Sequence, residues 1–123
     1  MHVKHVTQVP EQVTQAGEGV SFQVLWGSGE VPNFFMRRFR IRPGGSMPRH
    51  KNQVEHVQYV LQGRARIGIG DEEYEVKAGD AIYIPAGAPH WYRNIGNEDF
   101  VFLCMVPNQP DTLTLLEDDA GTS

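Results

Sequence analysis

Residues 79–94 read GDAIYIPAGAPHWYRN, a strand-like run that passes through a Pro and Gly turn and reaches His90. Residues 43–63 read PGGSMPRHKNQVEHVQYVLQG, in which His50 and His56 flank a second turn. Short runs rich in Val, Ile and Tyr between Gly and Pro turns are typical of β-strands. The two stretches therefore predict two hairpins that each carry histidine beside a turn.

The rest of the chain is punctuated in the same way. Turn signals containing Gly and Pro recur at short intervals, and helical periodicity is nearly absent. This pattern is the all-β signature of a sandwich or barrel. We expect eight strands, near residues 20–26, 34–41, 55–62, 64–69, 72–76, 81–84, 90–94 and 100–106. At 123 residues the chain suits one domain with a single core, and eight strands match a jelly roll.

Both stretches resemble the two motifs of the cupin family. The family's second motif is filled completely by Gly79, Pro85, Gly87, His90 and Asn94, and the slots of its first motif are occupied by Gly44, His50, Asn52, His56 and Gly63. Two residues of the first motif depart from the pattern, because Asn52 replaces a histidine and His56 replaces a glutamate. The chain is similar to small single-domain bacterial cupins of the cupin 2 type, and residues 55–61 resemble the small manganese cupins with four histidines. The resemblance implies a double-stranded β-helix, the cupin jelly-roll barrel.

The resemblance also implies a metal centre in the mouth of the barrel, with His50, His56 and His90 as ligands. Imidazole suits manganese, iron, copper, nickel and zinc, and three such ligands leave positions open for water or substrate. Residues two apart share a face of a strand, so Asn52 would point with His50 and lie beside the ion as a weaker oxygen donor. The alternative is a site that has lost its metal, where the histidines are merely hydrogen-bonded. We therefore expect a divalent transition metal of unassigned identity.

Strand alternation places other polar side chains around these histidines. Gln58 shares the inward face with His56, and Tyr92 shares it with His90. Each would contact a substrate, orient a histidine through its second ring nitrogen, or simply pack with one hydrogen bond. Arg37 lies among apolar residues and needs an anionic partner, either a protein carboxylate in a structural ion pair, which we favour, or a substrate carboxylate. Gln58, Tyr92 and Arg37 are therefore the candidate catalytic residues.

Segments on either side of the barrel, which is predicted to span residues 20–107, are expected to be peripheral. Residues 1–19 would form an amino-terminal arm or edge strand, and residues 108–123 a mobile acidic tail. The apolar runs are only strand-sized, so no membrane partner is expected, and the amino terminus lacks signal-peptide features, which indicates a cytoplasmic protein. The net charge of −4 is spread along the chain, so nucleic acid is not expected as a partner.

The only cysteine of the chain is Cys104, which excludes an internal disulfide and a four-thiolate zinc site. On the last predicted strand it shares a face with Phe102, and it would look into the cavity. We expect it to act as a small buried hydrophobe there.

These features predict a small metalloenzyme that acts on a compact organic substrate. A pocket walled by Phe102, Val60 and Cys104, with few acid or base groups, slightly favours a dioxygenase-like reaction. One alternative is a metal-dependent isomerase or lyase, which would need Tyr92 or Glu55 as its base. Others are a cupin that binds a sugar or small acid without turnover, and an inert scaffold.

Aromatic side chains that alternation assigns to the outside predict a homodimer. These are Trp26, Phe34 and Trp91. A second copy of the chain would cover them and protect the exposed sheet edges.

Overall fold

The structure is a computed structural model, and it describes residues 2–117. These residues form one short 3-10 helix and ten strands: η1 (Val6–Gln8), β1 (Gln12–Val13), β2 (Glu18–Trp26), β3 (Phe34–Lys51), β4 (His56–Gln62), β5 (Arg64–Ile69), β6 (Glu72–Lys77), β7 (Ala81–Ile84), β8 (His90–Asn94), β9 (Phe100–Pro107) and β10 (Thr114–Leu115). The predicted all-β jelly-roll fold is confirmed, and the eight predicted strands correspond to β2–β9. The 3-10 helix and the two-residue strands β1 and β10 have no counterpart in the prediction.

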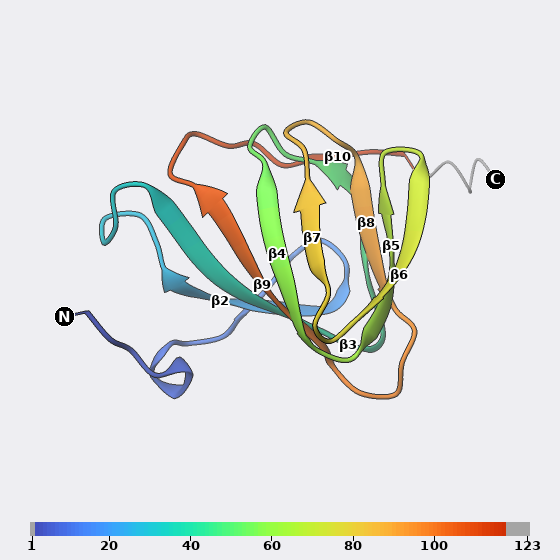
Figure 1. Ribbon diagram of the computed structural model, residues 1–123, viewed down its shortest axis with the longest axis horizontal. Helices are drawn as coiled ribbons and strands as arrows, with labels where there is room; N and C mark the ends of the chain where they lie inside the picture. Colours follow the sequence, from blue (N-terminus) through green and yellow to red (C-terminus); the bar gives the residue numbers. More distant parts are fainter. Residues whose placement is uncertain (1, 118–123) are drawn as a thin grey trace.

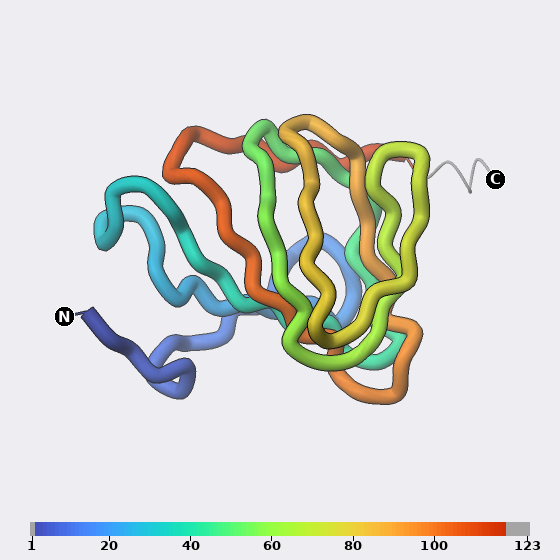
Figure 2. Tube along the Cα trace, in the orientation of Figure 1, coloured from blue at the N-terminus to red at the C-terminus, as the bar shows by residue number. Residues whose placement is uncertain are grey.

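The strands form one antiparallel sheet that curls into a barrel. Its hydrogen-bonded order is β6-β5-β8-β3-β9-β4-β7, with β2 and β10 also paired to β3 and with β1 paired to β2. Figure 1 shows the long strand β3 crossing the molecule, with β4 beside β7 and with β5 between β6 and β8. Figure 2 shows the amino-terminal segment at the opposite side of the view from the β5–β6 hairpin.

Strand β3 is longer than predicted, because it continues through the Pro43-Gly44-Gly45 segment where we expected a turn. Up to Ile41 it pairs with β9, and from Ser46 onward it pairs with β8. Gly44 adopts a φ of +79°, in the region that favours glycine. A Cβ atom on Gly45 would lie 2.6 Å from the carbonyl oxygen of Glu18. The segment therefore bends the strand from one partner to the next and carries His50 back to the barrel.

The core fills the inside of the barrel with side chains from the inward positions of the strands. Four aromatic rings form a continuous stack across it. Phe22 stacks on Phe39 at 5.5 Å between ring centroids, Phe39 on Phe102 at 5.3 Å, and Phe102 on Tyr92 at 5.1 Å. Such offset contacts stabilise aromatic pairs beyond the apolar area that they bury. The stack ends at Tyr92, which is one of the predicted site residues.

Both peripheral segments contact the barrel. In the amino-terminal segment, β1 pairs with β2, and the Lys4 ammonium lies 4.2 Å from the ring centroid of Trp26. In the carboxyl-terminal segment, β10 pairs with the end of β3. The rest of the predicted tail, residues 118–123, lies outside the described residues. Within residues 2–117, no helix has the length and apolarity that crossing a membrane requires.

Candidate functional site

All seven predicted site residues lie around one cavity of about 200 Å³ inside the barrel. The polar part of its wall includes Arg37, His50, Asn52, His56, Gln58, His90, Tyr92 and Cys104. The apolar part includes Phe22, Phe39 and Phe102, and Leu113 and Leu115 from the carboxyl-terminal segment. The convergence of these residues from β2, β3, β4, β8, β9 and β10 makes this cavity the candidate functional site.

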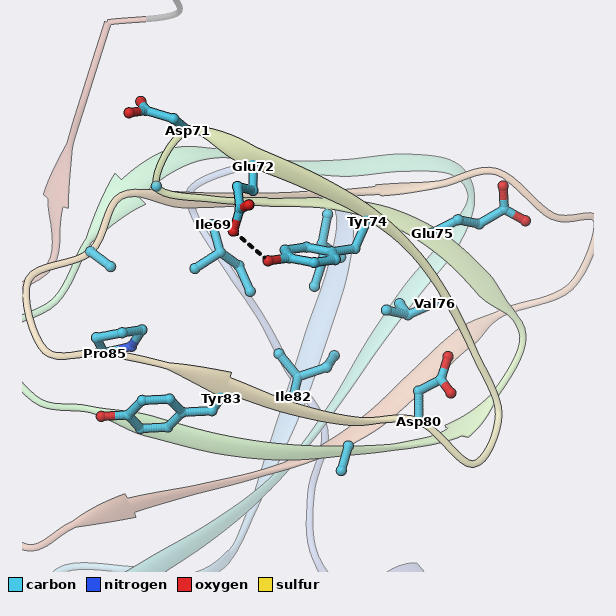
Figure 3. Close-up of a pocket in the computed structure, with 14 residues that line it drawn as sticks. Ile69, Asp71, Glu72, Tyr74, Glu75, Val76, Asp80, Ile82, Tyr83 and Pro85 are labelled. Carbon is cyan, nitrogen blue, oxygen red and sulfur yellow. Dashed lines mark hydrogen bonds between the residues drawn. The ribbon is translucent and has the colours of Figure 1, made fainter.

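A larger hollow of about 780 Å³ lies between the β5–β6 hairpin and β7 (Figure 3). Its polar lining is acidic or phenolic, and the Tyr74 hydroxyl donates a hydrogen bond of 2.7 Å to Glu72. None of the predicted site residues lines it. The smaller cavity is therefore the candidate functional site, because it gathers the titratable nitrogen donors and the buried polar groups.

Strand pairing brings the three histidines together. His50, at the end of β3, lies opposite His90, the first residue of β8. Their ring centroids are 4.1 Å apart, and the ring of His56, the first residue of β4, lies 5.6 Å from that of His90. All three side chains are buried. The two predicted hairpins thus deliver their histidines to the same end of the barrel.

Backbone carbonyls fix the orientation of two of these rings. His50 Nδ1 donates to the carbonyl oxygen of Pro48 at 2.7 Å, and His90 Nδ1 donates to that of Ala88 at 3.0 Å. A carbonyl can only accept, so Nδ1 carries the proton and Nε2 retains its lone pair. His56 has its Nδ1 3.3 Å from Cys104 Sγ, while its buried Nε2 has no hydrogen-bond partner.

Burial keeps the histidines neutral. It lowers the pKa of His56 to about 3, with the nearby charges of Arg37 and His90 adding to the effect. Burial and the charge of His50 lower the pKa of His90 to about 4. The pKa of His50 is also lowered, again mainly by burial. Neutral imidazole is the form that can bind a metal ion.

The side-chain amide of Asn52 is hydrogen-bonded through its nitrogen but not through its oxygen. Its Nδ2 donates to Asp111 Oδ2 at 3.0 Å, and its buried Oδ1 has no hydrogen-bond partner. Asp111 also accepts hydrogen bonds from the backbone N–H groups of Gln53, at 2.7 Å, and Val54, at 3.3 Å. The carboxylate therefore holds both the Asn52 amide and the loop between β3 and β4. Sequence reasoning missed Asp111, since no motif or spacing links a tail residue to the histidines.

Gln58 and Tyr92 form a buried pair beside the histidines. Gln58 Nε2 donates to the Tyr92 hydroxyl at 2.8 Å, and the hydroxyl lies 3.1 Å from Gln58 Oε1. Burial, followed by the nearby Cys104, raises the pKa of Tyr92. Gln58 Nε2 and Arg37 Nη2 both point to Cys104 Sγ, at 3.4 and 3.3 Å. The predicted inward orientation of Gln58 and Tyr92 is therefore observed, and Cys104 is a polar contact point as well as a buried side chain.

Three observations bear on whether a divalent ion fits here. In the side-chain positions of residues 2–117, no three His, Cys, Asp or Glu side chains are arranged to hold a metal ion. Yet His56 Nε2 and Asn52 Oδ1 are buried polar atoms without partners at the cavity. Buried polar atoms are nearly always paired, so these two indicate a missing partner. Neutral imidazole nitrogens and an amide oxygen are a donor set that suits transition metals. The residues therefore fit such an ion by their donor chemistry and their unpartnered atoms, whereas the present spacing of their side chains is wider than a bound ion requires.

Comparison with known proteins gives the family. The profile of the cupin domain matches residues 37–106. This chain belongs to the cupin family. The matched region contains every predicted site residue.

Similar proteins include enzymes. The chain is 32% identical over 110 residues to 1-methylthio-D-xylulose 5-phosphate methylsulfurylase of Rhodospirillum rubrum, covering 82% of this chain and 70% of that protein. It is 45% identical over 56 residues to the uncharacterized protein MJ1618 of Methanocaldococcus jannaschii, and it spans 45% of that relative's length. The structure of the polyketide cyclase RemF from Streptomyces resistomycificus has a TM-score of 0.84 at 27% identity, covering 99% of this chain and 91% of that one.

Proposed function

We propose that this cupin is a small metalloenzyme that binds one divalent transition metal and acts on a compact organic substrate in the barrel cavity. The ion is held by His50, His56 and His90 and is manganese, iron, copper, nickel or zinc. The single observation that carries the proposal is the buried Nε2 atom of His56, which lacks a hydrogen-bond partner at the cavity. A buried nitrogen lone pair without a partner is costly unless something binds to it.

Asn52 is the fourth candidate ligand. Because Asp111 accepts from Asn52 Nδ2, the amide cannot easily turn its nitrogen to the cavity, and Oδ1 is left without a partner. Groups that hydrogen-bond to a ligand in this way orient it and strengthen its binding. We therefore assign Asn52 Oδ1 as an oxygen donor that completes the histidine set, with Asp111 as its positioning residue.

The reaction that the cavity supports best is dioxygenase-like. When bound, a redox-active ion of this class activates dioxygen at its open coordination positions. An isomerase or lyase would need a positioned general base, and neither candidate suits that role. The raised pKa of Tyr92 keeps its proton on the hydroxyl, and Glu55 is exposed and hydrogen-bonded by Tyr83. Phe39 and Phe102 form an apolar wall that limits water, while Gln58 and Tyr92 offer hydrogen bonds to a bound reactant.

The chain is also proposed to form a homodimer. Of the three aromatic residues that suggested it, Phe34 is exposed, whereas Trp26 and Trp91 are only partly so. Further support comes from Val57, Tyr59 and Leu61 of β4 and Tyr83 of β7, which are exposed on the outer surface of the sheet. A second copy packed on this surface would remove apolar area from water. Light scattering after size exclusion measures the mass directly, and a monomer at high concentration would contradict the dimer.

The metal assignment is tested on protein purified without chelator. Metal analysis and calorimetric titration with Mn²⁺ are expected to give one ion per chain. The variant His56→Ala should weaken binding at least tenfold, in the range seen for altered metal sites. The matched control, His2→Ala, removes an exposed histidine and should leave affinity unchanged. Failure of manganese, iron, copper, nickel and zinc alike to bind, or equal affinities of the two variants, would refute the assignment. Oxygen consumption with candidate substrates then separates an oxygenase from a binding protein.

A further inference from the structure

The guanidinium of Arg37 lines the cavity without an ion pair among the described residues. Some arginines of the barrel have carboxylate partners: Arg40 lies 3.2 Å from Asp99, and Arg66 lies 3.0 Å from Glu73. The contacts of Arg37 are instead the sulfur of Cys104, at 3.3 Å, and the ring of Phe39, whose centroid is 5.1 Å from the guanidinium carbon. Its Nε is buried and has no hydrogen-bond partner.

An arginine whose contacts are a sulfur atom and an aromatic ring lacks a partner of opposite charge. Arg37 is half-buried, and even partial removal of a guanidinium from water is costly unless an opposite charge and further hydrogen bonds compensate it. A sulfur atom and an aromatic ring offer only part of that compensation. We propose that Arg37 makes the cavity an anion-binding pocket, which selects compact organic substrates that carry a carboxylate or phosphate group. This deepens the proposed function, since it rests on the same cavity being the substrate site.

Asp111 does not supply the missing charge. Its Oδ1 accepts from the backbone N–H groups of Gln53 and Val54, and its Oδ2 accepts from Asn52. The carboxylate is therefore engaged at the loop between β3 and β4. Arg37 is instead a neighbour of Cys104 and His56, because Arg37 Nη2 and His56 Nδ1 each lie 3.3 Å from Cys104 Sγ.

The volume of the cavity limits the size of the anion that it can hold. A volume of about 200 Å³ holds roughly seven water-sized groups, taking about 30 Å³ for each. The guanidinium fork can bind a carboxylate or phosphate through two parallel hydrogen bonds. Phe39 and Phe102 form the apolar wall beside it. The pocket thus suits a short anion whose charged end meets Arg37 and whose other end reaches the histidines.

The test measures binding of defined probes to the full chain without metal, by calorimetry or by NMR shifts. Malonate and methyl phosphate are the anions, and malonamide is the neutral counterpart of malonate. We expect wild type to bind at least one anion about ten- to hundredfold more tightly than malonamide, as a charge-assisted bidentate contact implies. The tighter of the two anions identifies the recognised group.

Variants locate the contact. Arg37→Met should lose about tenfold or more of the anion affinity, and Arg37→Lys should fall between it and wild type, because lysine keeps the charge but not the fork. The control Arg66→Gln removes an equal charge from an exposed position and should bind as wild type does. If Arg37→Met fails to fold, Arg37→Lys and the comparison of malonate with malonamide still decide the result.

The inference is overturned if malonamide binds as tightly as the anions, if Arg37 variants retain full anion affinity, or if wild type binds neither anion. Titration with Mn²⁺ is carried out in parallel on wild type and Arg37→Met. Arg37→Met is expected to bind the ion at least as tightly as wild type does, because Arg37 is not a ligand and the substitution removes a positive charge near His56. A protein that rejects Mn²⁺ and the other ions but binds malonate through Arg37 would refute the metalloenzyme and uphold the anion pocket.

Discussion

Acid should destabilise the metal-free protein well above the pH at which its carboxylates titrate. The unfolded chain has histidines with pKa values near 6.5. In the folded chain burial lowers the pKa of His56 to about 3 and that of His90 to about 4. Between these values and 6.5 the unfolded state binds protons that the folded state rejects. The free energy of unfolding is therefore not reduced by these two histidines above about pH 7, and it decreases as the pH falls below that value.

The size of the effect follows from the pKa differences. One unit corresponds to about 1.4 kcal/mol, so lowering the pH from 8 to 5 costs about 2 kcal/mol for each of these histidines, or about 4 kcal/mol for both. This is a large part of the roughly 5–15 kcal/mol that stabilises an ordinary domain. The lowered pKa of His50 acts in the same direction. Glu30, whose pKa is lowered by Lys4, titrates below this range.

Urea unfolding in the presence of EDTA, followed by tryptophan fluorescence at several pH values, gives the free energy of unfolding directly. The variant His56→Gln should remove about 2 kcal/mol of the difference between pH 8 and pH 5, because its amide does not titrate. If wild type is equally stable at both pH values, the rings are not buried neutral in the folded state, and the reasoning is wrong.

Two substitutions test the framework of the site. Asp111→Ala should weaken Mn²⁺ binding about tenfold in calorimetric titration, because Asn52 loses the contact that fixes its amide; unchanged affinity would mean that Asn52 is not a ligand. Gly45→Ala should lower the free energy of unfolding by about 1–3 kcal/mol, because its Cβ would lie 2.6 Å from a backbone oxygen. Gly96→Ala is the matched control, since its nearest contact would be 3.6 Å. Equal stability of these two variants would contradict a tight bend of β3 at Gly45.

Local sequence was enough to predict most of the barrel. Strands β4–β9 lie between Gly and Pro turns and alternate inward and outward residues, so their positions followed from the pattern. The position at which β3 ends could not be predicted from this pattern. The Pro43-Gly44-Gly45 segment has turn composition, yet pairing with β9 before it and with β8 after it keeps the strand extended. Only tertiary pairing distinguishes a bend within a strand from a turn that ends one.

In the candidate site, too, some contacts could be predicted from the sequence and others depend on tertiary pairing. The resemblance to the two cupin motifs implied that His50, His56 and His90 would share a cavity, and the pairing of β3 with β8 places His50 opposite His90. The contact between Asp111 and Asn52 joins residues 59 positions apart and depends on how the carboxyl-terminal segment returns to β3. No periodicity encodes that return, so the sequence could not reveal it.

For Arg37, strand alternation predicts the direction of the side chain but not the partner of its charge. Its strand position predicts an inward side chain, but whether a half-buried guanidinium has a carboxylate partner depends on every residue around it. In the described chain the acidic side chains near the cavity are engaged elsewhere, so the positive charge remains available to a ligand. A cation held by the histidines would add to the positive potential of Arg37 in the cavity. The cation and Arg37 would both favour an anionic reactant. A neutral reactant would leave the half-buried Arg37 unpaired, whereas an anion would compensate both charges at once.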